Sequence, residues 1–66
     1  MDISGKIAIV SGAAAGIGRA VAVALAQAGA KGVTLADMDD VGNAETARLV
    51  EAAGTQALPL HIDVTN

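Results

Sequence analysis

The feature that most restricts the fold of this chain is the glycine-rich stretch SGAAAGIG at residues 11–18. It directly follows an apolar, β-branched run, KIAIVS at 6–11, and it leads directly into a run with helical spacing. Residues with so little side chain let backbone approach backbone, or approach a ligand, without obstruction. The stretch therefore predicts a strand that turns at once into a helix, with an accessible main chain at the turn.

Two further apolar runs are predicted as strands. They are GVTLAD at 32–37 and ALPLHID at 57–63, and Pro59 makes the second an edge strand or places its start near the proline. With helices between them, the order strand, helix, strand, helix, strand predicts parallel strands joined by right-handed crossovers. We therefore expect a partial Rossmann-type α/β fold, the β-α-β-α-β first half of a doubly wound sheet, with both helices on one face.

The two helices are predicted from apolar spacing and from their end signals. In the first, Gly29 is the stop, and the residues predicted to form the inner face are Ile17, Val21, Ala24, Leu25 and Ala28. In the second, Asp40 is the predicted cap, Gly54 is the stop, and the weaker inner stripe is Ala44, Ala47 and Val50.

Composition excludes several classes of function. The 66 residues suffice for one domain at most, and the four basic residues, against seven acidic ones, are scattered rather than clustered as a nucleic-acid surface would need. No cysteine is present, so disulfides and thiolate metal sites are excluded. The N-terminal residues do not resemble a signal peptide, and no apolar run is long enough for a membrane span. We expect a cytoplasmic protein with no membrane partner.

The glycines fit a phosphate site at the start of the first helix. Unpaired N–H groups and a partial positive charge gather there, and a diphosphate can reach them where side chains are absent. Gly12 would allow the sharp turn, Gly16 and Ile17 would offer N–H groups, and Gly18 would let the helix press against the sheet. The spacing G-x-x-x-G-x-G is neither G-x-G-x-x-G nor a Walker-type loop, which needs a following lysine.

Acidic residues follow the second and third strands. Asp37 lies 19 positions after Gly18, where a carboxylate can accept hydrogen bonds from a ribose diol, and Asp63 ends the third strand. A turn former and a helix cap are the alternative interpretations of Asp37 and Asp63. The aspartates around position 39 are interpreted as a solvated cap rather than a metal site, and His61 as a packed or edge-facing histidine rather than a catalyst.

Taken in register, these motifs resemble the short-chain dehydrogenase/reductase family. Residues 11–18 are similar to the family's T-G-x-x-x-G-I-G loop, with serine in place of threonine, and LAD and DVT are similar to its ribose and adenine segments. The resemblance implies contacts to the adenine amino group and ring from Asp63 and Val64. The full set of cofactor-binding residues that it implies is Gly12, Ala15, Gly16, Ile17, Gly18, Asp37, Met38, Asp63 and Val64.

The resemblance also implies a cofactor and an activity. Asp37 would repel a 2′-phosphate, and Ala15 stands where NADP-preferring relatives carry a basic residue, so NAD is expected over NADP. The complete enzyme would transfer hydride between NAD(H) and a small alcohol or ketone, and would be a homo-oligomer. The family's catalysis uses Ser, Tyr and Lys, and this sequence contains no tyrosine. Residues 1–66 are therefore expected to be the N-terminal part of a single dinucleotide-binding domain, without catalytic or metal-binding residues and inactive alone.

Two alternatives remain open, and the glycine spacing argues against a third. A stand-alone nucleotide-binding mini-domain would keep the same loop without catalysis, and an inactive truncation would carry inherited motifs. A methyltransferase-type site would also use an acidic ribose ligand, but its glycines normally fall at every second position, unlike GAAAG here. The strands are apolar on both faces, so we expect the 66 residues alone to be marginally stable, aggregating or self-associated.

Overall fold

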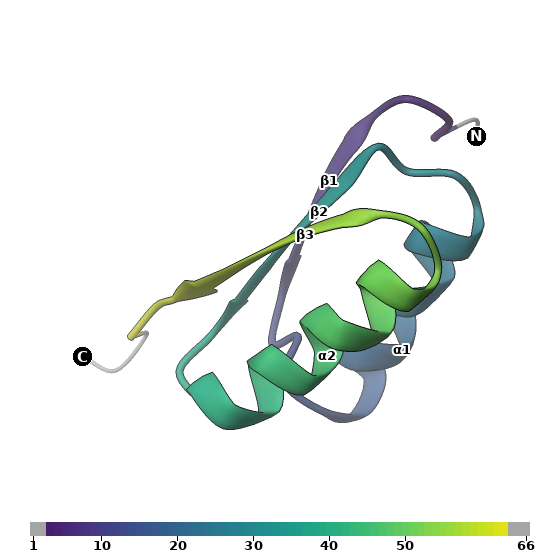
Figure 1. The fold of residues 1–66 in the computed structure, drawn as a ribbon. Helices are drawn as coiled ribbons and strands as arrows, with labels where there is room; N and C mark the ends of the chain where they lie inside the picture. The colour runs from purple at the N-terminus through teal and green to yellow at the C-terminus, as the bar shows by residue number, and fades with distance from the viewer. Residues whose placement is uncertain (1–2, 64–66) are drawn as a thin grey trace.

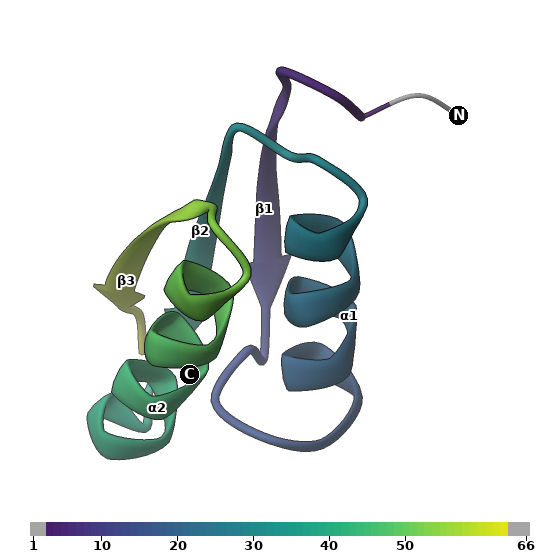
Figure 2. The ribbon, with the colours of Figure 1, turned by 45° about the vertical axis from the view of Figure 1, so that its right-hand side comes forward.

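The computed structural model describes residues 3–63, which form a three-stranded parallel sheet and two helices. The elements are β1 (Ile7–Ser11), α1 (Gly16–Gln27), β2 (Gly32–Asp37), α2 (Asp40–Ala52) and β3 (Gln56–His61). The strands lie in the order β1-β2-β3, and both helices cover one side of the sheet (Figures 1 and 2). The predicted partial Rossmann-type architecture is confirmed.

The strand register brings the carboxyl ends of the strands to one edge of the sheet. Ser11 of β1 lies beside Ala36 of β2, and Asp37 lies beside His61 of β3. Pro59 lies opposite Leu35 within β3, on the outer strand, where a missing N–H group is tolerated. Of the two predicted alternatives for this strand, the edge position is observed and a start near the proline is not, since β3 begins at residue 56. It ends at residue 61 rather than at the predicted residue 63.

The core lies between the helices and the sheet and consists mostly of small side chains. Its buried members are Val10, Ala13, Ala22, Ala26, Ala30, Val33, Leu35, Ala47 and Val50. Alanines on the helices let the backbones of α1 and α2 lie close to the strands. The glycine-rich loop contributes Ala13 to this core, so part of the loop is packed inside the protein.

The predicted inner face of α1 is wrong at four of its five residues, and only Leu25 packs against the core. Ile17 is 84% exposed and Val21 is 43% exposed, and the predicted residues Ala24 and Ala28 are exposed too. The inward face is a row of small residues spaced by four, in which Gly18 contacts the loop and Ala22 and Ala26 are buried in the core, with Leu25 partly buried beside them. Because α1 is apolar around most of its circumference, apolar spacing could not select the face. Close packing selects the smallest side chains instead.

The predictions for α2 need two corrections. The cap is Asp39 rather than Asp40, since the Asp39 carboxylate accepts a hydrogen bond from the Gly42 N–H at 3.1 Å. Ala47 and Val50 are buried as predicted, but Ala44 is exposed. In its place α2 buries two polar residues, Asn43 and Thr46.

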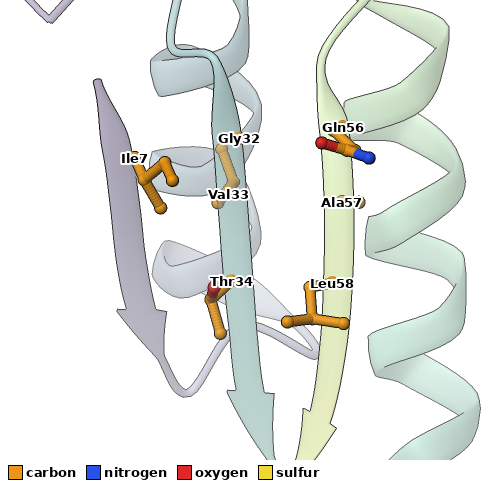
Figure 3. A pocket seen from close by; sticks show the side chains of 7 residues that line it. All are labelled: Ile7, Gly32, Val33, Thr34, Gln56, Ala57 and Leu58. Atoms are coloured by element: carbon orange, nitrogen blue, oxygen red, sulfur yellow. The ribbon is translucent and has the colours of Figure 1, made fainter. Parts of the chain in front are cut away.

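The opposite face of the sheet is open and apolar. Its exposed large side chains are Ile7, Ile9, Leu58 and Leu60. Figure 3 shows Thr34 and Leu58 side by side on β2 and β3, with Ile7 of β1 beside Gly32. These four residues line a hollow of about 260 Å³ together with Val33, Gln56 and Ala57. None of these seven described lining residues is ionisable. Neither helix in residues 3–63 is long and apolar enough to cross a membrane.

Candidate functional site

The loop between β1 and α1 depends on glycine at two positions. Gly12 and Gly16 have φ values of +67° and +59°, which is left-handed backbone that side chains disfavour. A Cβ atom at either position would meet no heavy atom within 4 Å. The glycines are therefore required by the backbone path, as predicted for the turn at Gly12. The space beside them is open enough for a ligand to approach the main chain.

Gly18 has a different role. Glycine is required at this position because of a close contact and not because of its backbone conformation. A Cβ atom there would lie 1.9 Å from the carbonyl oxygen of Gly12 and 3.1 Å from the Cα of Ala13. Any side chain would push the loop off the helix. The sequence predicted a close contact between Gly18 and the sheet, whereas the contact is with the loop itself.

The first turn of α1 presents N–H groups that no side chain caps. Its cap residue is Ala15, which makes no side-chain hydrogen bond, and no acidic residue lies in the turn. The N–H groups of Gly16, Ile17 and Gly18 have no acceptor within the helix. α2, by contrast, is capped by Asp39. The start of α1 is therefore the end better suited to an anionic ligand.

Asp37 is fixed beside this loop by two backbone hydrogen bonds. Its Oδ1 accepts from the Asp39 N–H at 2.9 Å, and its Oδ2 accepts from the Ala14 N–H at 3.0 Å. These bonds, the one from Asp39 most strongly, hold the pKa of Asp37 below its usual value. The carboxylate is therefore anionic at neutral pH, and it is held against the loop although 23 residues separate it from Ala14.

A hollow of about 290 Å³ lies at the carboxyl ends of the strands. Its lining residues are Ser11, Gly12, Ala36, Asp37, Met38 and Ile62. Of these, Gly12, Asp37 and Met38 were predicted from the sequence. Ile62 was missed, although it directly follows β3, where residues of a parallel sheet meet ligands, and its N–H donates to the Asp37 carbonyl at 3.1 Å.

The other predicted residues lie around this hollow or beyond the described chain. Ala15, Gly16 and Ile17 are exposed at the start of α1. Asp63 is exposed beyond the end of β3 and does not line the hollow. Val64 lies outside the described residues, so its predicted place beside an adenine ring stays a prediction.

His61 lies on the edge strand and is paired rather than packed. Its Nδ1 is 2.8 Å from Oδ1 of Asp40, and both side chains are exposed. The hydrogen bond to Asp40 and the negative charge of that carboxylate raise the pKa of His61. Within residues 3–63, no group of three or more histidine and acidic side chains is arranged to hold a metal ion.

A protein-family model described as short chain dehydrogenase matches residues 6–66. This chain belongs to that family. Short-chain dehydrogenase anuF of Penicillium roqueforti is 45% identical over 64 residues, which cover 91% of this chain and 23% of that protein.

Solved structures of family members have the same fold. A short-chain dehydrogenase/reductase from Burkholderia phymatum, in complex with NAD, is 38% identical with a TM-score of 0.89, covering 100% of this chain and 23% of that one. A 3-oxoacyl (acyl-carrier-protein) reductase from Agrobacterium tumefaciens C58, with NADP bound, is 34% identical with a TM-score of 0.86, covering 97% and 24%. The chain spans about a quarter of the length of these relatives.

Proposed function

We propose that this chain forms the adenosine side of an NAD-binding site, and that the whole protein is an oxidoreductase acting on an alcohol or ketone. One observation carries the proposal. The uncapped start of α1, the open glycine loop and the anionic Asp37 adjoin one another at the carboxyl edge of the sheet. A diphosphate needs the first two, and an adenosine ribose needs the third.

Different residues of the site would bind different parts of the cofactor. Gly16 and Ile17 would donate N–H groups to the diphosphate, with Gly12 and Ala15 keeping the approach clear and Gly18 letting the loop pack on α1. Asp37 would accept hydrogen bonds from the ribose hydroxyls. Met38 and Asp63 would flank the adenosine, with Val64 beside them, and the hollow of about 290 Å³ provides apolar wall for the ring.

Bound NAD would supply the chemistry, which is hydride transfer at its nicotinamide ring. The residues of this chain would bind and orient its other half, and none of them is proposed as catalytic. We propose residues 1–66 as the N-terminal part of one dinucleotide-binding domain. On the family resemblance alone, we also propose a cytoplasmic homo-oligomer that takes a small alcohol or ketone as substrate.

NAD is proposed over NADP for electrostatic reasons. Solved relatives hold either cofactor, so the choice depends on this chain's own residues. The pKa of Asp37 is lowered, which keeps a negative charge where a 2′-phosphate would lie. Arg19, the basic residue nearest the loop in sequence, directs its Nη2 to the main-chain carbonyls of Ala14 and Gly42.

The test is a titration of the natural full-length protein with NADH and NADPH, followed by cofactor fluorescence. We expect NADH to bind at least about tenfold more tightly, which corresponds to about 1.4 kcal/mol. Asp37→Asn should weaken NADH binding by about tenfold, because charge-assisted hydrogen bonds to the ribose are lost.

Glu51→Gln is the matched control, since it also removes one negative charge but lies at the far end of α2. It should leave both affinities unchanged. Tighter binding of NADPH than of NADH would contradict the NAD preference. No binding of either cofactor would contradict the proposed function itself.

A further inference from the structure

The side chain of Arg19 is bound between α1 and α2, directly beneath the glycine loop. Its Nε donates to Thr46 Oγ1 at 2.8 Å, and its Nη2 donates to the Ala14 carbonyl at 2.6 Å and the Gly42 carbonyl at 3.0 Å. An arginine that donates from Nε and Nη2 to one loop and one helix turn restrains the position of one relative to the other, because the guanidinium is planar and rigid.

Thr46 completes this arrangement from α2. Its side chain is fully buried, and its Oγ1 lies 2.7 Å from the Ala13 carbonyl and 3.2 Å from the Gly42 carbonyl. A hydroxyl has one proton to donate, so the shorter contact to Ala13 takes it, and a lone pair accepts from Arg19. Two successive loop carbonyls, those of Ala13 and Ala14, are therefore held by side chains of α2 and α1.

Fixing these carbonyls also fixes the N–H groups on the other side of each peptide. All described peptides are trans, so C=O and N–H point in opposite directions. With the Ala13 carbonyl on Thr46, the Ala14 N–H points to Oδ2 of Asp37, 3.0 Å away. With the Ala14 carbonyl on Arg19, the Ala15 N–H points away from the guanidinium.

The first turn of α2 packs against the loop so closely that there is no space for a side chain at residue 42. A Cβ atom at Gly42 would lie 2.8 Å from the Ala14 carbonyl oxygen and 2.7 Å from Oδ2 of Asp39. Glycine in the first turn of α2 is what allows the loop carbonyl to reach Arg19. The contact is therefore built by three residues, Arg19, Gly42 and Thr46, none of which belongs to the glycine motif.

We propose that Arg19 and Thr46 are positioning residues of the cofactor site. By holding the Ala13 and Ala14 carbonyls, they aim the Ala14 N–H at Asp37 and so set how strongly the site distinguishes a ribose diol from a 2′-phosphate. The inference rests on the proposed function, because it acts through Asp37. It goes beyond that function because it assigns part of the preference for NAD over NADP to Arg19 of α1 and Thr46 of α2, which lie outside the loop.

A purely structural tie between the helices would behave differently. It would lower stability and weaken NADH and NADPH binding by the same factor. A positioning role lowers NADH affinity more, since only the ribose of NADH gains from a well-held Asp37, while a loosened carboxylate repels the 2′-phosphate of NADPH less. The ratio of the two affinities separates the two roles.

The experiment measures both affinities in the natural full-length protein. Thr46→Val removes the hydroxyl at nearly constant volume, and Arg19→Met keeps the aliphatic stem without the donors. We expect each to weaken NADH binding by about tenfold and NADPH binding by less than about threefold, from the loss of charge-assisted bonds acting through Asp37.

The matched controls are Thr46→Ser, which restores the hydroxyl, and Lys31→Met, which also removes a positive charge. Lys31 is exposed just before β2, at the amino end of that strand, whereas the loop lies at the carboxyl edge of the sheet. Both controls should keep the affinity ratio within about twofold of wild type, because Thr46→Ser keeps the bond to the Ala13 carbonyl and Lys31→Met leaves Arg19 and Thr46 in place. Arg19→Lys keeps the positive charge but loses the planar guanidinium. It replaces Arg19→Met if that variant does not fold, and its ratio of NADH to NADPH affinity should lie between those of wild type and Thr46→Val.

Suppose that the wild-type protein prefers NADH. If the ratio of NADH to NADPH affinity is then unchanged in Thr46→Val and in the Arg19 variant that folds, this inference is overturned and the proposed function stands. Equal losses for both cofactors also overturn it, in favour of the structural tie. A wild-type protein that binds neither cofactor contradicts the proposed function, and the inference with it.

Discussion

Gly18 and Gly12 show how a single missing methyl group determines the shape of this loop. The 1.9 Å separation between a Gly18 Cβ and the Gly12 oxygen is far below any real carbon–oxygen contact. The obstructing atom is backbone, which cannot rotate away as the end of a flexible side chain would. The carbonyl of Gly12 therefore packs on α1 only while residue 18 has no side chain.

We expect Gly18→Ala to displace the loop, destabilise the protein by about 1–3 kcal/mol as an overpacked site does, and weaken NADH binding at least about tenfold. Gly32→Ala is the control, because its Cβ would meet its nearest neighbour, the Gln56 oxygen, at an ordinary 3.7 Å. It should leave NADH binding unchanged. Chemical denaturation and NADH titration measure both effects, and a Gly18→Ala protein with wild-type affinity would show that the loop adapts.

At the scale of elements, an ion pair joins the end of β3 to the start of α2. His61 of β3 and Asp40 of α2 lie 2.8 Å apart at the carboxyl edge of the sheet, beside Asp37 in the strand register. The pKa of His61 is raised above 6.5, chiefly by the hydrogen bond to Asp40 and then by the charges of Asp40 and Asp63. Because the folded value is the higher one, the pair stabilises the protein fully below pH 6.5 and is lost as pH rises through the raised value.

An NMR titration of the His61 ring tests this pair. We expect a midpoint above 6.5 in the wild type and a lower one in Asp40→Asn, because the charge and most of the acceptor strength are removed. Glu51→Gln, which removes a carboxylate from the other end of α2, should leave the midpoint unchanged. Equal midpoints in wild type and Asp40→Asn would mean that the pair does not persist in solution.

Element order and type could be predicted from the sequence, but helix orientation could not. Glycine and aspartate mark the ends of β1 and β2, and apolar runs predict the strands. α1 is apolar nearly all round, so its inward side is revealed by contacts in the structure, which are those of Gly18 with the loop and of Ala22 and Ala26 with the core. Thr46 is buried because its hydroxyl donates a hydrogen bond to the Ala13 carbonyl, 33 residues away in the sequence. Apolar periodicity within one helix cannot predict such a long-range contact. The loop and Asp37 were therefore predictable, while Arg19, Gly42 and Thr46 beneath them were not.

At the scale of the whole molecule, the two faces of the sheet differ in what covers them. The helices cover one face, and four large apolar side chains are exposed on the other: Ile7, Ile9, Leu58 and Leu60. Burying a side chain of this size stabilises a protein by roughly 1.5–3 kcal/mol, so the four together rival the 5–15 kcal/mol or so of a typical domain. Parallel sheets are normally covered on both faces for this reason.

We therefore expect residues 1–66, expressed alone, to self-associate through the open face of the sheet. Sedimentation velocity should show dimers or larger species, and Ile9→Lys combined with Leu58→Lys should shift the protein toward monomer, because charges on that face oppose burial. Val41→Lys is the matched control, since Val41 is 83% exposed but lies on α2, and it should leave the association unchanged. A wild-type monomer with a sharp cooperative melt would instead show that one covered face is sufficient for this sheet.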